Sequence, residues 1–147
     1  MITDSLIQLF KRDLNKLITE VNLYTNESNL WIVDKSISNS AGNLCLHLVG
    51  NLKTYIGANL GNTGYIRHRD LEFSLKNVPR SEMVKQVEET VIIVEDALKK
   101  LTPSDLEKEC LPQGFDKPMT IEYFLILLSM HLSYHLGQIN YHRRLLD

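Results

Sequence analysis

The stretch Ile121–Ile139, IEYFLILLSMHLSYHLGQI, indicates the fold class of this 147-residue chain. Its large apolar residues recur at steps of three and four, the spacing that gathers side chains on one face of an α-helix. His131 and His135 border this apolar face and are themselves four residues apart. The stretch therefore predicts an amphipathic helix that begins near Thr120, continues towards Asp147 and carries two imidazoles at the edge of a buried face.

Three other segments show the same helical period. A Ser- and Asn-rich approach offers several N-caps to the second of them, and Thr102-Pro103 ends the third. No segment has the pattern of a strong strand, because the β-branched run 91–94 lies inside a helical stripe. The three segments and the C-terminal segment together predict an all-α fold, a four-helix bundle with long connecting loops. The three segments run from about Leu6 to Tyr24, from about Ala41 to Leu60 and from about Ser81 to Leu101.

The connections between the predicted helices are long, at 25–39, 61–80 and 103–119. Connections of this length are uncommon in a compact bundle and often have a function or face a partner. The chain length and the 44% hydrophobic composition suit one domain with a sizeable core. We therefore expect a single domain over residues 1–147.

The composition excludes several classes of protein. A net charge of −2 provides no basic footprint for nucleic acid. The longest uninterrupted apolar run, Phe124–Leu128, is far shorter than the roughly 18 residues of a membrane span. The N-terminal segment lacks the order of charges and apolar residues found in a signal peptide, and two cysteines are too few for a disulfide scaffold. These features predict a cytoplasmic protein without nucleic-acid or membrane partners.

The histidines suggest the chemistry. His131 and His135 project from one helix face about 6 Å apart along the axis, so both rings can reach one ion. A buried neutral histidine needs partners for both ring nitrogens, and a metal ion satisfies two neighbouring rings at once. His47, on the second predicted helix, is a third candidate ligand. A site of three histidines keeps coordination positions open, which is typical of catalytic rather than structural metal sites.

The helix face around His47 is unusually small and polar, with Gly50 close to the histidine. Such residues on an otherwise apolar helix indicate a pocket wall or the close approach of a ligand. Ordinary packing is the alternative for each of the neighbouring polar residues. The residues that could contact substrate or orient the ligands are Asn43, Asn51, Tyr134 and Gln138.

Other interpretations of the histidines stay open at this point. A lone His47 could be an interior histidine satisfied by hydrogen bonds. His142 lies about 10 Å beyond His135 along the helix axis and cannot reach the same ion. Metalloprotease and di-iron sites are excluded, because position 132 is leucine and no glutamate stands three residues before a histidine. We expect His68 to be solvated and Cys45 to be a small core residue.

Three stretches of the chain resemble the DinB-like superfamily, and the similarity covers nearly the whole chain. It is closest to an uncharacterised subfamily within a group that includes bacillithiol transferases. The stretches are Asn43-Leu-Cys-Leu-His47-Leu-Val-Gly-Asn51, Gly61-Asn-Thr-Gly-Tyr-Ile-Arg67-His-Arg69-Asp-Leu-Glu72-Phe73 and His131-Leu-Ser-Tyr-His135-Leu-Gly-Gln138-Ile139.

The resemblance implies an up-up-down-down four-helix bundle, often a homodimer, in which three histidines hold one divalent metal ion. Carried over to this chain, the ligands are His47, His131 and His135. The metal in the superfamily is zinc or nickel, and sometimes iron or manganese. The resemblance implies no role for the Arg-x-Arg-x-x-Glu-Phe motif that begins at Arg67.

A divalent ion held by three neutral imidazoles activates a coordinating water or thiol. With the resemblance, this predicts a metal-dependent S-transferase using a low-molecular-weight thiol, or a hydrolase, acting on a small molecule. Non-catalytic binding of a metal or small molecule in a stress response is an alternative, as are purely structural histidines. No residue stands out as a catalytic base. Arg67 and Arg69 could hold carboxylates of a peptide-like thiol, but a surface ion pair with Asp70 or Glu72 is the simpler interpretation.

Overall fold

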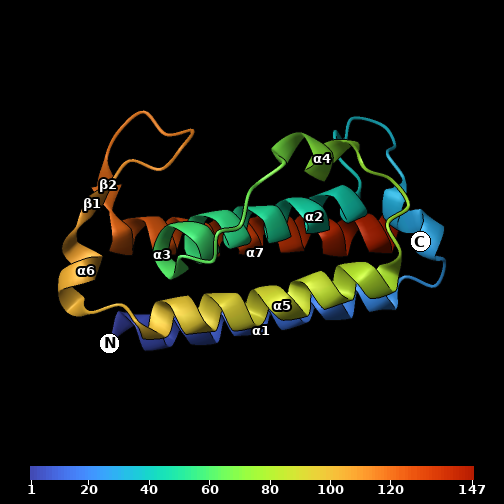
Figure 1. Ribbon diagram of the computed structural model, residues 1–147. Coiled ribbons are helices and arrows are strands. Elements are labelled where there is room, and N and C mark those ends of the chain that lie inside the picture. Colours follow the sequence, from blue (N-terminus) through green and yellow to red (C-terminus); the bar gives the residue numbers. More distant parts are fainter.

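The computed structural model describes residues 1–147 and consists almost entirely of helices (Figure 1). The all-α prediction is therefore confirmed. The side-chain hydroxyls of Ser40 and Thr120 cap the second and fourth long helices by accepting hydrogen bonds from backbone N–H groups of the first turn. The four long helices are α1 (Ile2–Leu23), α2 (Ala41–Leu52), α5 (Arg80–Lys99) and α7 (Ile121–Leu146).

The second predicted helix, expected to reach about Leu60, changes its winding after Leu52. A π-helix, η2 (Lys53–Ala58), follows α2 without a break and leads into the single turn α3 (Asn59–Gly61). Such wide turns inside helices often accompany functional sites. The predicted extent of this helix is therefore right, but the regular α-helical winding ends at Leu52 and a π-helix follows.

The long connections contain short elements that the helical period did not predict. They are too short for periodicity to reveal, and the strands pair over only two residues each, Glu109 with Thr120 and Cys110 with Met119. These elements are the 3-10 helix η1 (Glu27–Trp31), the helices α4 (Arg69–Ser74) and α6 (Pro103–Glu107), and the antiparallel strands β1 (Glu109–Cys110) and β2 (Met119–Thr120).

The four long helices pack side by side, with α1 against α5 and α7, and α2 against α5 and α7. Their apolar stripes meet in one continuous buried cluster. Tyr24 bonds to His142 and Glu20 to Arg143, so the C-terminal ends of α1 and α7 lie together and the two helices run in parallel. Lys53, Gly57 and Gly61, on the continuation of α2 through η2 and α3, lie against Glu89, Ile93 and Ala97 of α5 in turn, so this continuous helical segment and α5 run in parallel.

The order of helix directions is therefore up-down-down-up and not the up-up-down-down order implied by the resemblance. Figure 1 shows α1 and α7 running one way and α2 and α5 the other. The physical reason is the place of the long crossover. The 61–80 connection returns along the length of α2, so that α5 starts at the end where α2 started, while the other two connections turn at the ends of the bundle.

None of the helices combines the length and the apolar character that crossing a lipid bilayer requires.

Candidate metal centre

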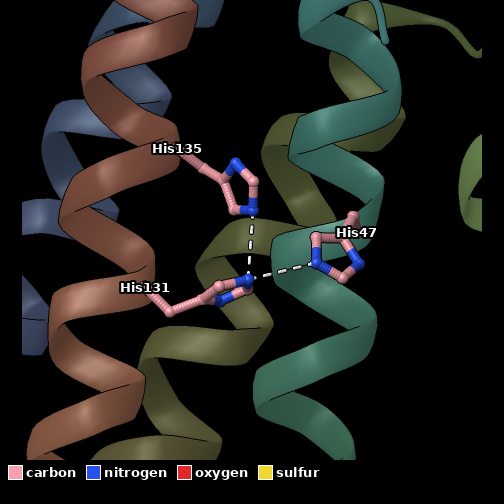
Figure 2. A group of neighbouring side chains, drawn as sticks. All are labelled: His47, His131 and His135. Atoms are coloured by element: carbon pink, nitrogen blue, oxygen red, sulfur yellow. Dashed lines mark hydrogen bonds between the residues drawn. The ribbon is translucent and has the colours of Figure 1, made fainter. Parts of the chain in front are cut away.

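The three histidines of the predicted ligand set come from two neighbouring helices. His47 lies in the middle of α2, and His131 and His135 occupy successive turns of α7, which packs against α2. Figure 2 shows the three rings pointing into the space between these helices. His47 is buried, with 7% of its surface exposed, and the other two rings are partly buried. Helical spacing on α7 and the packing of α2 therefore bring together residues 84 positions apart in the chain.

The ring nitrogens converge at the spacing that a metal ion requires. The Nε2 atom of His131 lies 3.3 Å from Nε2 of His47 and 3.0 Å from Nε2 of His135. One nitrogen from each ring falls within a group of atoms all less than 4.8 Å apart. Zinc–nitrogen bonds of about 2.0–2.1 Å in a tetrahedral site place neighbouring nitrogens about 3.3 Å apart. The residues therefore fit a mononuclear site, and this group could hold a metal ion.

Protein groups alone do not satisfy this cluster. Nδ1 of His131 is buried without a hydrogen-bond partner. Its Nε2 faces two other imidazoles, and a single proton on that atom can serve only one of them well. Burial, with repulsion from His135, His47 and Arg67, lowers the pKa of His131 to about 4. His131 is therefore neutral at physiological pH, as a metal ligand must be.

His135 is oriented by a neighbour on its own helix. Its Nδ1 lies 2.7 Å from Oε1 of Gln138, so Nδ1 donates to the amide oxygen and Nε2 keeps its lone pair. Burial lowers the pKa of His135, although the bond to Gln138 acts in the opposite direction. Tyr134 is 65% exposed, and its ring lies 5.4 Å from the ring of His135. Of the predicted neighbours, Gln138 thus contacts a ligand directly and Tyr134 lies beside it.

The two asparagines have different surroundings. Asn43 holds the short helix α4 in place, because its side-chain N–H₂ donates to the carbonyls of Glu72 and Leu75. This is a structural role, and nothing in its contacts suggests substrate binding. Asn51 is buried at 7% exposure, and its Oδ1 has no hydrogen-bond partner.

Glu72 is the functional candidate that the sequence did not reveal. It is buried at 6% exposure, and its Oε1 lies 3.0 Å from Nδ1 of His47. Arg67 donates from Nε and Nη2 to the two oxygens of this carboxylate, each at 2.9 Å. Burial alone would raise the pKa of Glu72, but the bonds from His47 and Arg67 outweigh it and hold that pKa below its ordinary value. The ion pair between Arg67 and Glu72 expected at the surface is therefore largely buried, and it lies behind His47, a candidate metal ligand.

The other sequence expectations concern residues away from the centre. Arg69 places its guanidinium 5.2 Å from the centre of the Phe73 ring. His68 is exposed and Cys45 is fully buried, both as predicted, and burial raises the pKa of the Cys45 thiol to about 12. His142 bonds to Tyr24 and to the carbonyl of Ile32, outside the cluster.

A cavity of about 770 Å³ opens beside His135, the one member of the cluster that lines it. His135, Gln138 and Tyr134 line it on the α7 side, and the loop 34–39 lines it opposite. Its volume lies within the range of about 300–1,000 Å³ that small-molecule sites occupy. A molecule in this cavity would lie against the edge of the His135 ring.

A family model described as "Protein of unknown function (DUF1572)" matches residues 3–147 of the chain. No curated protein matches it. Because the match spans nearly the whole chain, the chain belongs to this family.

Proposed function

We propose that this member of the DUF1572 family binds one divalent metal ion through His47, His131 and His135 and uses it in S-transfer or hydrolysis of a small molecule. The observation that carries the proposal is the convergence of the Nε2 atoms, with separations of 3.0 and 3.3 Å from His131. An ion held by three neutral imidazoles supplies a Lewis acid that lowers the pKa of a coordinating thiol or water.

The donor set restricts the metal by class. Three imidazole nitrogens suit zinc, nickel, iron and copper better than calcium or magnesium, which prefer oxygen. With the resemblance to the DinB-like superfamily, this favours zinc or nickel, with iron or manganese as further candidates. The cluster contains three protein ligands, and a tetrahedral ion would therefore keep one position for a substrate or a thiol.

The cavity beside His135 supports a small-molecule substrate, and a low-molecular-weight thiol is the co-substrate that the resemblance favours. The side chains of Gln138 and Tyr134 line this cavity next to the ligand ring, so they are placed to orient what binds there. We therefore assign Gln138 and Tyr134 a role in positioning the substrate and not in the chemical step. The homodimer, which the resemblance implies, is a separate prediction.

A binding protein without turnover is the second candidate. One observation favours it: Glu72, the carboxylate in contact with His47, has both oxygens occupied by His47 and Arg67. This carboxylate is therefore not free to act as a general base.

Among the two enzymatic alternatives, the lack of a free general base favours an S-transferase over a hydrolase, because a thiol activated by a metal ion needs no separate base.

Elemental analysis of protein purified without a metal-affinity column tests the proposal. We expect about one divalent ion per chain in the wild type and less than about a tenth of that in His131→Ala, because the remaining two rings form a poor site. Metal content that is unchanged in the variant would reject the assignment.

A screen of small thiols with chlorinated or epoxide electrophiles then separates an enzyme from a binding protein. Turnover that depends on both the metal and His131 supports S-transfer. A bound ion without turnover of these substrates or of amides and thiol conjugates favours the binding protein.

A further inference from the structure

The 61–80 connection places a carboxylate behind the metal centre. It carries both Arg67 and Glu72, and it runs back along α2, where α4 packs on that helix. Through this arrangement Glu72 reaches His47 on the side of the ring opposite to the cluster: Nδ1 faces Glu72 and Nε2 faces His131. The two nitrogens of one imidazole thus link the connection to the candidate metal site.

The charge on Glu72 decides where the His47 proton lies. A carboxylate that is ionised can only accept hydrogen bonds, so Nδ1 of His47, 3.0 Å away, must donate. Arg67 pairs with both carboxylate oxygens and keeps the group in its charged form. With the proton on Nδ1, a neutral ring has its lone pair on Nε2, the atom that faces His131.

The surrounding fold holds the carboxylate in this place. A Cβ atom on Gly50 would lie 1.9 Å from Oε2 of Glu72, so only glycine leaves room for the carboxylate one turn after His47. The Phe73 ring lies against the His47 ring, with 4.8 Å between their centres. Asn43 ties the end of α4 to α2 through the carbonyl of Glu72 at 3.0 Å. The small residue that suggested a close ligand approach is therefore approached by a side chain of the protein.

We propose that Glu72 is a positioning residue, clamped by Arg67 in the space left by Gly50, that holds His47 with Nδ1 protonated and Nε2 available to a metal ion. This inference rests on the proposed function, because a lone pair on Nε2 serves the protein only when a cation binds there. It assigns the Arg-x-Arg-x-x-Glu-Phe motif to the metal centre. Carboxylates that accept from a ligating histidine typically strengthen metal binding by about 10- to 100-fold.

A second, partly buried ion pair offers a control. Glu20 accepts from Arg143 at 2.7 Å and from Asn140, and the pair joins α1 to α7. Its removal tests what the loss of a partly buried carboxylate does to the fold alone. A purely structural Glu72 would behave like Glu20 in every measurement.

The first readout is the imidazole ¹⁵N spectrum of the metal-free full-length protein. We expect His47 to show the Nδ1–H tautomer in the wild type and in Glu20→Leu, and to shift towards Nε2–H in Glu72→Leu. Glu72→Gln preserves side-chain size but removes the charge and adds an N–H₂ donor that can face Nδ1 of His47. If the leucine variant does not fold, we expect Glu72→Gln to fold and to shift part of the His47 population towards Nε2–H. Unchanged His47 signals in folded Glu72→Leu, or a wild-type Nε2–H tautomer, overturn the inference.

The second readout is the Zn²⁺ dissociation constant, measured by competition with a chromophoric chelator. We expect about 10-fold weaker binding in Glu72→Gln and up to about 100-fold in Glu72→Leu, against less than about twofold in Glu20→Leu. Equal losses of thermal stability with unchanged zinc affinity in the Glu72 variants would overturn the positioning role. Failure of the wild type to bind Zn²⁺, Ni²⁺, Fe²⁺ or Mn²⁺ rejects the proposed function, while the tautomer measurement still decides the role of Glu72.

Discussion

His142 and His131 lie on the same helix and both have buried ring atoms, but their ring nitrogens have different hydrogen-bond partners. Nδ1 of His142 lies 2.6 Å from the hydroxyl of Tyr24, and Nε2 donates to the carbonyl of Ile32 at 2.8 Å. Both of its nitrogens are therefore satisfied by protein groups. His131 has one buried nitrogen without a partner and another that faces two imidazoles. The set of hydrogen-bond partners, more than burial, therefore separates a structural histidine from a candidate metal ligand.

The gain in stability on zinc binding should distinguish His131 from His142 most strongly. At a free Zn²⁺ concentration about 1,000 times the dissociation constant, ligand binding stabilises the wild type by about 4 kcal/mol. We expect His131→Ala to lose nearly all of this increment and His142→Phe to retain it. Denaturant unfolding with zinc and after chelation measures both, and equal increments in the two variants would remove the distinction.

The next largest effect should be the loss of stability of the metal-free protein when His142 is replaced. His142→Phe keeps the ring volume but leaves the Tyr24 hydroxyl and the Ile32 carbonyl without their partner. We expect the free energy of unfolding to fall by about 2–3 kcal/mol, because each buried group left unpaired costs about 1–3 kcal/mol. Urea unfolding of metal-free protein measures this loss, and a variant as stable as the wild type would show that His142 is not structural.

Acid should destabilise the metal-free protein partly through His131. Its folded pKa is about 4 against an ordinary value of 6.5, so below pH 6.5 the unfolded chain binds a proton that the folded chain does not. The free energy of unfolding therefore falls as the pH drops from 6.5 to about 4 and then levels off. Because the ring is partly exposed and solvent screens it, we expect about 1–2 kcal/mol from this residue.

Unfolding of metal-free His131→Asn isolates this contribution, since every other titrating group is retained. The variant should lose less stability than the wild type between about pH 7 and pH 4.5. Parallel stability curves for the two proteins would contradict the prediction.

The smallest expected effect concerns the bond that orients His135. Gln138→Ala removes the acceptor 2.7 Å from Nδ1, but this part of the site borders the cavity and water can replace the amide. We expect zinc affinity to fall by about 3- to 10-fold, at or below the lower end for such contacts. A chelator competition assay measures it, and a loss as large as that of His131→Ala would mean that Gln138 does more than orient a ring.

Helical periodicity predicted the long helices well, because the apolar faces of α1, α5 and α7 repeat over many turns. It did not predict their directions, since a stripe shows which face is buried and not which way the chain runs. The order implied by resemblance was wrong in this respect. The crossover that sets the order lies in the 61–80 connection, which has no helical repeat beyond the single short helix α4.

The sequence predicts those residues of the candidate site whose positions follow from spacing along a helix. It does not predict the residue whose position depends on the path of the 61–80 connection. His131 and His135 share a face of α7 by their four-residue spacing, and His47 entered as a third candidate on another helix. Glu72 reaches His47 only because the 61–80 connection folds back on α2, which no local pattern reveals. Gly50 was the available signal, but a glycine on an apolar helix does not say what approaches it.

An anomalous difference map from crystals of zinc-loaded protein, recorded on both sides of the zinc absorption edge, would show whether the three histidines bind one metal ion. We predict one peak between α2 and α7, about 2.0–2.1 Å from Nε2 of each of His47, His131 and His135. A map with no zinc peak at the three rings, or with the ion held elsewhere, would show that these histidines do not form the metal site.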